Sequence, residues 1–437
     1  MKSYLSPKVF RWTESVLVCL YSISKTSFLI RILKNFNDKE GTYVFASSLF
    51  TKICSFLTSL ILIRVLSPEN FGILSYVLSA LAFFIPFSGG GIQYSYLRFA
   101  PMLSGDRERN ELFKYSIKRG LLLTVLSAVV LLVLVPWLSK PVGDASVLFY
   151  CALVYLFSFF LIELVKTKYR VAFQNKKYAG FDAKLSVIVL LLGCGLAYVY
   201  GSLAYLLVLA CVPLFLSLPE LKFKSKSSLD VPKNYHSYGL WVGVGAIASQ
   251  LMYSLDVFLI GQFIQDSQQV ALYRSASIIP LALFFIPNSY ITTHYADIAK
   301  HSTDKNYLIQ FSKDYCKVFA LISLLLGLLL YLMSDFIVVN FFGAGYADAV
   351  PLFKVLLIGM VGAFVLRIPF GNLLASVGRS NWNAFVAFAI LVLNGVLNYY
   401  ALRAWGIIGA AIVTSGLLWI SGLISLILFS RYLKSLH

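Results

Sequence analysis

Long apolar stretches separated by short polar links make up most of the sequence. A helix needs about 20 mainly apolar residues to cross a bilayer, because it rises only about 1.5 Å per residue. Because 59% of the residues are hydrophobic and only 13% are charged, we predict an all-α polytopic membrane protein with about 12 transmembrane helices. The predicted spans are residues 43–66, 73–97, 118–138, 146–166, 184–200, 203–219, 239–262, 271–295, 316–333, 349–376, 383–401 and 405–430.

Lysine and arginine residues are distributed unevenly between the links. Of the 37, 30 lie in the first 41 residues, in alternate links or at the C-terminus, whereas only Arg64, Lys140 and Arg403 lie at the opposite ends of the spans. Cytoplasmic loops carry such an excess, so both termini are predicted to be cytoplasmic. The net charge of +18 does not indicate nucleic-acid binding, since the basic residues are spread over short loops rather than gathered in one patch.

The first 41 residues differ from the rest because their apolar patches are interrupted by charges. The apolar run 16–23 is too short to span a bilayer and is followed by no small-residue cleavage site of a signal peptide. We expect an amphipathic helix on the cytoplasmic membrane surface, with a dispensable extension as the alternative.

Motifs of enzymatic chemistry are missing from the sequence. It contains no Walker A loop, no HExxH pair and no long polar link that could hold a catalytic site. The six cysteines lie in or beside apolar runs without a CxxC pair, which is typical of small core residues rather than metal ligands. We therefore predict neither an enzyme nor a bound metal or cofactor.

A short repeat divides the chain into two halves. The sequence AFFIP at residues 82–86 recurs as LFFIP at residues 283–287, each near the end of a span. Six spans in each half give two parallel repeats, predicted to form an N-lobe (42–220) and a C-lobe (237–437) that are joined by a cytoplasmic linker (221–236) and related by pseudo-two-fold symmetry around a central cavity. Pro86 and Pro287 are predicted to kink their helices and to take part in gating. The glycines at 89–91 suit either a bend or ordinary close helix packing.

Several segments resemble one known family, the polysaccharide (O-antigen type) flippases of the multidrug/oligosaccharidyl-lipid/polysaccharide exporter superfamily. The resemblance depends on their order and spacing over about residues 42–430, although the chain lacks the two extra helices of the murein-precursor flippases. The segments are IRVLSPENFG (63–72), DVFLIGQFIQDSQQVALY (256–273), GNLLASVGR (371–379), LNGVLN (393–398) and GIIGAA (406–411).

The resemblance implies a transport function. It implies two six-helix lobes, alternating access in the bacterial inner membrane, and an undecaprenyl-pyrophosphate-linked oligosaccharide as cargo. It also implies contact with membrane lipids, and polysaccharide polymerase and chain-length proteins are candidate partners.

Five basic residues are candidate ligands for the pyrophosphate of such a cargo. Lys52 and Arg367 lie near the middle of their spans, where a cation is costly, so we expect them to face the cavity. A structural hydrogen bond to a neighbouring helix is the alternative for both. Lys354 and Arg98 lie close to span ends, where their side chains can reach the membrane surface, and Arg274 completes the set.

Asp256 and Arg274 lie at similar depth on either side of a short link. We expect them to form an ion pair, serving either as a structural bond or as a gating and coupling element. Asn394 and Asn398, one helical turn apart, are expected to join helices through their amides.

Charge inside the spans separates the candidate functions. The predicted spans contain four basic residues (Lys52, Arg274, Lys354 and Arg367) and only two acidic ones (Glu163 and Asp256). This excess of positive charge favours an anionic cargo. A multidrug or cation antiporter of the same superfamily is the first alternative, and it would need more acidic side chains. A membrane glycan polymerase is the second, and it would need a large outer loop.

Overall fold

The computed structural model describes residues 41–103, 105–143, 145–221 and 231–436. The predicted surface helix before residue 41 and most of the predicted linker lie outside these residues. The described chain is helical almost throughout and contains no β-strand, only an isolated bridge between Pro141 and Gly143.

The helices of the first half follow one another with short connections. They are α3 (Gly41–Val65), α4 (Pro68–Phe84), the 3₁₀ helix η2 (Ile85–Gly91), α5 (Ile92–Phe99), η3 (Ala100–Met102), α6 (Asp106–Leu138), α7 (Ser146–Val171), α8 (Asn175–Ile188), the π-helix η4 (Val189–Gly193), α9 (Cys194–Ser217) and η5 (Leu218–Leu221).

The second half repeats this pattern. It comprises α10 (Tyr235–Ile264), α11 (Ser267–Leu283), α12 (Phe285–Lys300), α13 (Lys305–Leu332), α14 (Ser334–Ile337), the π-helix η6 (Val338–Phe342), η7 (Ala344–Ala349), α15 (Val350–Gly362), the π-helix η8 (Ala363–Arg367), α16 (Ile368–Ser376), α17 (Ser380–Trp405) and α18 (Ile407–Ser435).

Ten helical segments of the described residues are long and apolar enough to cross a membrane. Twelve spans were predicted, and two features of the structure explain why only ten segments are counted. The segment Asn175–Leu221 holds two of them in 47 residues, broken at Gly201, where φ is 77° and ψ is −163°. The other is α10, a helix of 30 residues that covers the predicted span 239–262.

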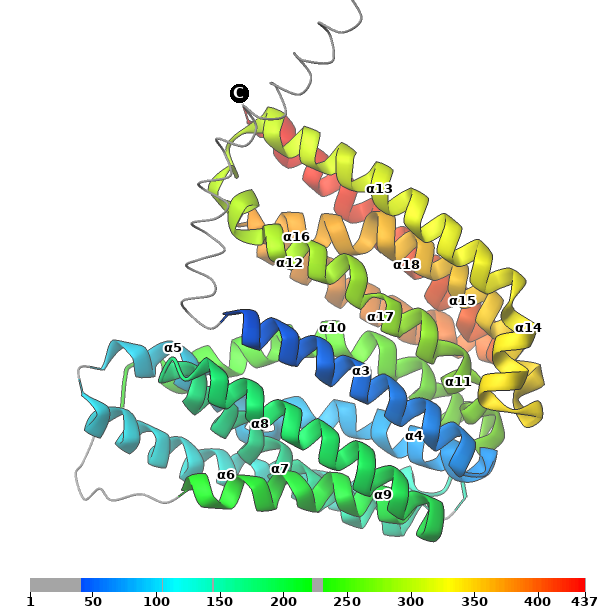
Figure 1. Cartoon of the computed structure of the whole chain (residues 1–437), viewed down its shortest axis with the longest axis horizontal. Helices are drawn as coiled ribbons and strands as arrows, with labels where there is room; N and C mark the ends of the chain where they lie inside the picture. The colour runs from blue at the N-terminus through cyan, green and yellow to red at the C-terminus, as the bar shows by residue number, and fades with distance from the viewer. Residues whose placement is uncertain (1–40, 104, 144, 222–230, 437) are drawn as a thin grey trace, which may run out of the picture.

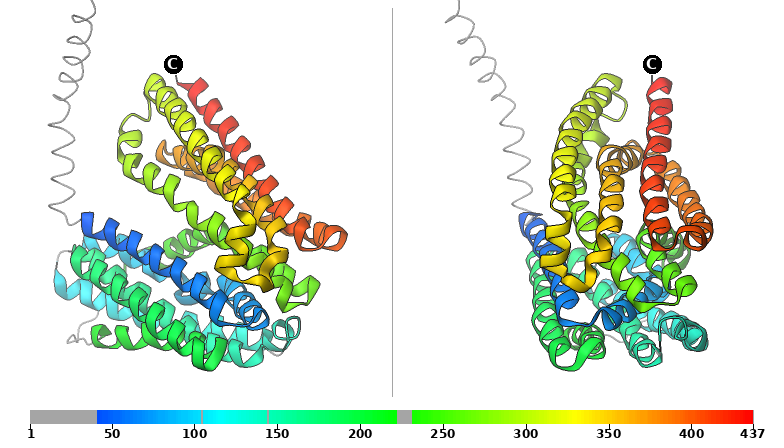
Figure 2. Two further views of the ribbon diagram at one scale, coloured as in Figure 1. Left: turned by 45° about the vertical axis from the view of Figure 1, so that its right-hand side comes forward. Right: turned by 90° about the vertical axis from the view of Figure 1, so that its right-hand side faces the viewer.

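The helices form two groups that meet at one end and diverge at the other (Figures 1 and 2). One lobe contains α3 to α9, the other α12 to α18, and α10 and α11 run between them. The lobes diverge where α3 begins and α12 ends, which we call the splayed end. They meet where α3 ends and η6 and η7 lie, which we call the closed end.

The motif at 63–72 joins the lobes at the closed end. The Nε atom of Arg64 donates to the carbonyl oxygen of Phe341 at 2.9 Å, and its Nη2 atom donates to that of Asn340. Phe71 packs edge-on against Tyr346 with 6.5 Å between ring centroids. A Cβ atom on Gly72 would lie 1.8 Å from the carbonyl oxygen of Ser267, so only glycine allows this approach of α4 to α11.

Both repeated prolines follow an interruption of their helix. Helix α4 ends at Phe84, and η2 contains non-helical angles at Ser88, Gly89 and Gly90. Helix α11 ends at Leu283, and α12 begins at Phe285, two residues before Pro287. The glycines at 89–91 serve both as a bend and as a contact, because a Cβ atom on Gly91 would lie 2.0 Å from the carbonyl oxygen of Gly239 on α10. A gating role for Pro86 and Pro287 stays a prediction.

Candidate functional site

Asp256 of α10 lies where that helix packs against α11, α17 and α18, with only 2% of its surface exposed. Its Oδ2 atom accepts hydrogen bonds from the hydroxyls of Thr414 at 2.5 Å and Tyr273 at 2.6 Å. Its Oδ1 atom accepts from the amide nitrogens of Asn398 at 2.8 Å and Asn394 at 3.0 Å. We call these five residues the Asp256 cage. A buried carboxylate is thus held by four donors, all of them uncharged.

The cage is assembled from four helices that are distant in sequence. Asn394 and Asn398 are four residues apart on α17, so both amides point from one face of that helix toward α10. Tyr273 comes from α11 and Thr414 from α18. The expectation that the two asparagines join helices is confirmed. Their shared partner was not anticipated, although a lone acid and two amides in apolar segments each need a polar partner.

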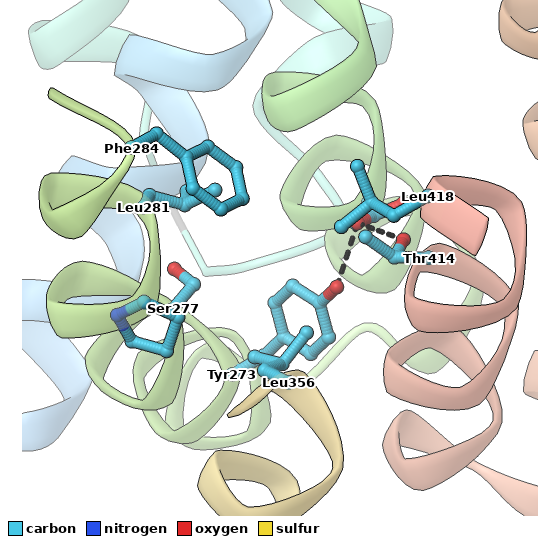
Figure 3. Close-up of a pocket in the computed structure, with 9 residues that line it drawn as sticks. Tyr273, Ser277, Leu281, Phe284, Leu356, Thr414 and Leu418 are labelled. Atoms are coloured by element: carbon cyan, nitrogen blue, oxygen red, sulfur yellow. Dashed lines mark hydrogen bonds between the residues drawn. The ribbon is translucent and has the colours of Figure 1, made fainter. Parts of the chain in front are cut away.

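A cavity of about 20 Å³ adjoins the carboxylate between α11, α15 and α18 (Figure 3). Its polar lining consists of Asp256, Tyr273, Ser277 and Thr414, and Leu281, Phe284, Leu356 and Leu418 supply apolar walls. This volume suits one water molecule or one small ion.

Two oxygen atoms of the cage are left without a hydrogen-bond partner. The Oδ1 atoms of Asn394 and Asn398 are buried and accept no bond from the described residues. If either side-chain amide rotated by about 180°, its nitrogen and oxygen would exchange places, and the oxygen would lie beside the Asp256 carboxylate and the Thr414 hydroxyl. Such an all-oxygen set can take up a proton on Asp256 or a hard cation. The described residues contain no cluster of three or more His, Cys, Asp or Glu side chains suited to a metal ion.

The expected ion pair between Asp256 and Arg274 is not formed, and this expectation is corrected. Tyr273 faces Asp256, and the next residue along a helix points about 100° away from it. Arg274 accordingly points elsewhere, and the ionisable side chain that interacts with it is Tyr205 of α9 in the other lobe.

Lys52 lines a groove between the two lobes. The groove has a volume of about 210 Å³ and lies between α3 on one side and α11 and α12 on the other. Its remaining walls are apolar, formed by Leu49, Ile53, Phe56, Ile279, Ala282, Leu283, Phe285 and Ile286. Lys52 is exposed there and has no ion pair within the described chain. The groove therefore offers one cation within an apolar surface.

The other predicted cargo ligands lie apart from this groove. Arg367 donates from Nη1 to the Oδ1 atom of Asn383 on α17 at 2.9 Å, which is the structural hydrogen bond named as the alternative. Lys354 lies 3.3 Å from Asp335, and Arg98 lies over the ring of Tyr238. None of the three lines the Lys52 groove. A role for them in cargo binding stays a prediction.

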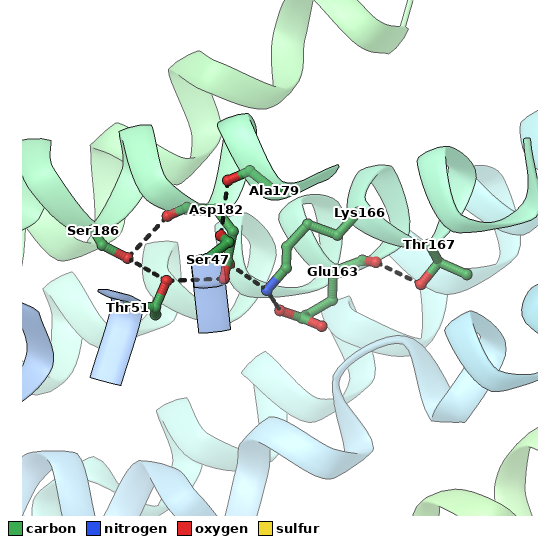
Figure 4. Close-up of polar contacts among 8 residues, drawn as sticks. All are labelled: Ser47, Thr51, Glu163, Lys166, Thr167, Ala179, Asp182 and Ser186. Atoms are coloured by element: carbon green, nitrogen blue, oxygen red, sulfur yellow. Dashed lines mark hydrogen bonds and ion pairs between the residues drawn. The ribbon is translucent and has the colours of Figure 1, made fainter. Parts of the chain in front are cut away.

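A second group of charges lies in the N-lobe, with Lys166 and Asp182 mostly buried and Glu163 about one-third exposed (Figure 4). The Nζ atom of Lys166 lies 2.9 Å from Glu163 Oε1 and 2.9 Å from Asp182 Oδ1. Thr51 of α3 donates to Asp182 Oδ2 at 3.0 Å, and Ser186 donates to Thr51 at 3.2 Å. We call these five residues the Lys166 cluster. Glu163 was counted among the charges inside the predicted spans, and the sequence did not indicate that Asp182, on the next helix, completes the group.

A family model decides the classification of the chain. Residues 39–295 match the model described as polysaccharide biosynthesis protein, which is more than half of the sequence. The chain belongs to this family. It is a multi-pass membrane protein, as the sequence predicted.

Relatives with described roles match parts of the chain. A putative O-antigen transporter of Shigella flexneri is 28% identical over 181 residues, which cover 41% of this chain and 43% of the relative. A teichuronic acid biosynthesis protein, TuaB, of Bacillus subtilis is 25% identical over 199 residues, covering 45% of this chain and 39% of the relative. The chain thus spans less than half the length of either relative.

Solved structures confirm the predicted fold class of two six-helix lobes. The lipid II flippase MurJ in an inward closed conformation aligns over 90% of this chain and 89% of its own with a TM-score of 0.74 at 14% identity. A multidrug resistance MATE family transporter of the MOP superfamily, in an inward-facing conformation, aligns over 88% of this chain and 95% of its own with a TM-score of 0.68 at 14% identity. At this identity the likeness concerns the fold alone.

Proposed function

We propose that the protein is a flippase that moves a lipid-linked oligosaccharide across the bacterial inner membrane by alternating access. The single observation that carries this proposal is the groove at Lys52. A lone cation among apolar walls suits a phosphate that is attached to a long hydrocarbon chain, such as undecaprenyl pyrophosphate. Membership of the polysaccharide biosynthesis family and the O-antigen transporter among the relatives support the same cargo class.

The orientation of the lobes fits uptake from the cytoplasm. With both termini cytoplasmic, the splayed end faces the cytoplasm and the closed end faces the opposite side. Transport would then require the closed-end contacts of Arg64 and Phe71 to separate. Reporter fusions after Lys177 and after Lys305 are expected to report a cytoplasmic location, and one within 334–346 the outer side. The reverse pattern would overturn this orientation.

The Asp256 cage is the proposed coupling element. A proton or cation bound there would neutralise the carboxylate and alter its hydrogen bonds to α11, α17 and α18. Because α11 also packs along α4 of the other lobe, a change at Asp256 can reach the interface between the lobes.

Loss of the gene in its own bacterium tests the transport proposal. We expect surface polysaccharide to disappear and the lipid-linked repeat unit to accumulate in the inner leaflet. The intact gene should restore the polysaccharide, whereas Lys52→Ala should restore it poorly. Normal surface polysaccharide in the deleted strain would refute the proposal.

A multidrug antiporter is the alternative, supported by the MATE-like fold and the buried Asp256. That function requires a site attractive to cationic compounds, and the exposed ammonium of Lys52 opposes it. Unchanged susceptibility of the deleted strain to cationic drugs and dyes would exclude the alternative, and increased susceptibility with normal polysaccharide would establish it.

A further inference from the structure

The exposed face of α12 is polar over two helical turns. Its exposed side chains between residues 288 and 295 carry an amide or a hydroxyl group: Asn288, Tyr290, Thr292, Thr293 and Tyr295. The aliphatic side chains Ile291 and Ile298 point to the opposite side, where each is at most 1% exposed. We call the five exposed residues the polar face of α12.

Helix α13 of the same lobe has the opposite character. Its exposed residues from 318 onward are almost all aliphatic: Val318, Leu321, Ile322, Leu324, Leu325, Leu328, Leu329 and Leu332, joined by Tyr331. Side chains that face hydrocarbon are expected to be of this kind, because a hydroxyl or amide without a partner costs several kcal/mol in lipid, on the order of 4–8 kcal/mol for transfer to cyclohexane. Residues 288–295 are the last eight of the 29-residue candidate span Ser267–Tyr295, so the polar face lies toward the splayed-end edge of the membrane, where it meets water or a polar ligand rather than hydrocarbon.

Hydrogen-bonding capacity remains free on this face. Asn288 donates to the carbonyl oxygen of Phe284 at 2.8 Å, and Thr293 donates to that of Ser289 at 2.9 Å, so both side chains are fixed by their own helix. No side chain from another described helix binds Asn288, Thr292 or Tyr295. The face therefore presents ordered acceptors and hydroxyls without partners from the rest of the described chain.

An aromatic ring, that of Tyr290, is held rigidly on the same helix, about 160° around the helix axis from Asn288 and Thr292. The ring of Tyr290 stacks on His294 with 4.4 Å between centroids, and Phe319 of α13 supports it from the edge at 5.2 Å. It is nevertheless 38% exposed. A supported and accessible aromatic ring can pack against the C–H face of a sugar, and the hydroxyl of Thr293, three residues further along, lies on the same side of the helix.

The polar face continues the groove that contains Lys52. Phe285 and Ile286, at the start of α12, line that groove, and Asn288 follows two residues later in the direction of the splayed end. Figures 1 and 2 show α12 on the edge of its lobe nearest to α3. A molecule with its phosphate at Lys52 and its hydrocarbon chain along the apolar walls would have its polar body beside α12.

We propose that the polar face of α12 binds the glycan of the transported lipid, chiefly through Asn288 and Thr292, which lie one helical turn apart on the same side of the helix. This proposal rests on the proposed function. No lysine, arginine, aspartate or glutamate lies between residues 288 and 295, so the face recognises neutral sugar hydroxyls rather than acidic groups.

Binding of two lipids by the full chain in nanodiscs tests the proposal. The probes are undecaprenyl pyrophosphate, which has no glycan, and the lipid-linked repeat unit extracted from polymerase-deficient cells of the source bacterium. The double variant N288L/T292V should bind the glycan-bearing lipid about tenfold more weakly or worse, since two neutral hydrogen bonds are lost. Its binding of undecaprenyl pyrophosphate should be unchanged. The control Ser312→Ala, which removes a hydroxyl bonded to its own helix on α13, should change neither.

Each outcome has a distinct meaning. Equal affinities of N288L/T292V and the unaltered protein for the glycan-bearing lipid would overturn the glycan site, as would equal weakening for both lipids. Failure of the unaltered protein to bind either lipid would overturn the proposed function itself.

Thiol labelling provides a test that does not depend on the cargo. Thr292→Cys should react with a membrane-impermeant thiol reagent, whereas Leu325→Cys on the aliphatic face of α13 should not, each measured against the parent chain. Protection of both cysteines would place the polar face in lipid and refute the inference.

Discussion

The Asp256 cage and the Lys166 cluster both hold charged side chains that are largely shielded from solvent, but they compensate the charge differently. Asp256 is a single carboxylate held by amides and hydroxyls that carry no charge. Lys166 is a cation that lies 2.9 Å from each of two carboxylates. In the Lys166 cluster a cation contacts both carboxylates directly, although their combined charge exceeds its own by one. The Asp256 carboxylate has no cation among its hydrogen-bond partners, so its charge is left for a proton or cation to neutralise.

The two sites also differ in how easily their contacts can rearrange. The Lys166 cluster ties α7 to α8 and, through Thr51, to α3, which also carries Lys52 of the groove. It therefore holds the helix that carries Lys52 against α7 and α8. The Asp256 cage joins helices through donors that can rearrange at small cost, because hydroxyls rotate and amides turn over. Such a site suits a change of occupancy during transport.

The largest expected effect is on the Lys166 cluster. Lys166→Met should destabilise the protein by about 3–5 kcal/mol, because it leaves two carboxylates close together without their cation. Thermal unfolding of the purified protein and its abundance in the membrane measure this effect. Adding Asp182→Asn should restore part of the stability, and a double variant no more stable than Lys166→Met would show that these charges do not interact.

At the Asp256 cage, function should change more than stability. Asp256→Asn keeps the size of the side chain, and the hydroxyls of Tyr273 and Thr414 can turn to accept from the new amide. Abundance should therefore stay near normal, while surface polysaccharide output falls about tenfold or more because the ionisable group is lost, an effect of at least about 1.4 kcal/mol on transport. Normal output at normal abundance would remove Asp256 from the coupling mechanism.

Removing one hydroxyl from each site compares them directly. Thr414→Val takes away a hydrogen bond to a carboxylate that has only uncharged donors, and should cost about 1.5–3 kcal/mol of stability. Thr51→Val takes away a bond to Asp182, which keeps Lys166 as its partner, and should cost about 1 kcal/mol. Chemical denaturation under identical conditions measures both, and an equal cost would indicate that the two carboxylates are equally compensated.

The smallest expected effect is the coupling between Asp256 and Arg274. Because Arg274 points away from the carboxylate, the effects of Asp256→Asn and Arg274→Gln on abundance should add to within about 0.5 kcal/mol. A double-mutant cycle that departs from additivity by more than that would mean that the two residues approach each other in another conformation.

The sequence by itself determined the helices, the two halves and the family. In a membrane each helix satisfies its own backbone hydrogen bonds, so its existence and position depend on local hydropathy. Prolines and glycines likewise act where they occur, which is why the interruptions near Pro86, Gly201 and Pro287 could be located from residue type. The depth of Lys52, Asp256 and Arg367 in their spans could be counted for the same reason.

Only the tertiary structure decided which of these side chains meet. Contacts between helices depend on the rotation of each helix about its axis, and one residue changes that rotation by about 100°. Depth alone therefore suggested Arg274 as the partner of Asp256, whereas rotation placed Tyr273 there and brought Asn394, Asn398 and Thr414 from distant parts of the chain. The exposure of Lys52 to a groove and the engagement of Arg367 by Asn383 have the same origin, because each depends on how separate helices pack rather than on the sequence around one residue.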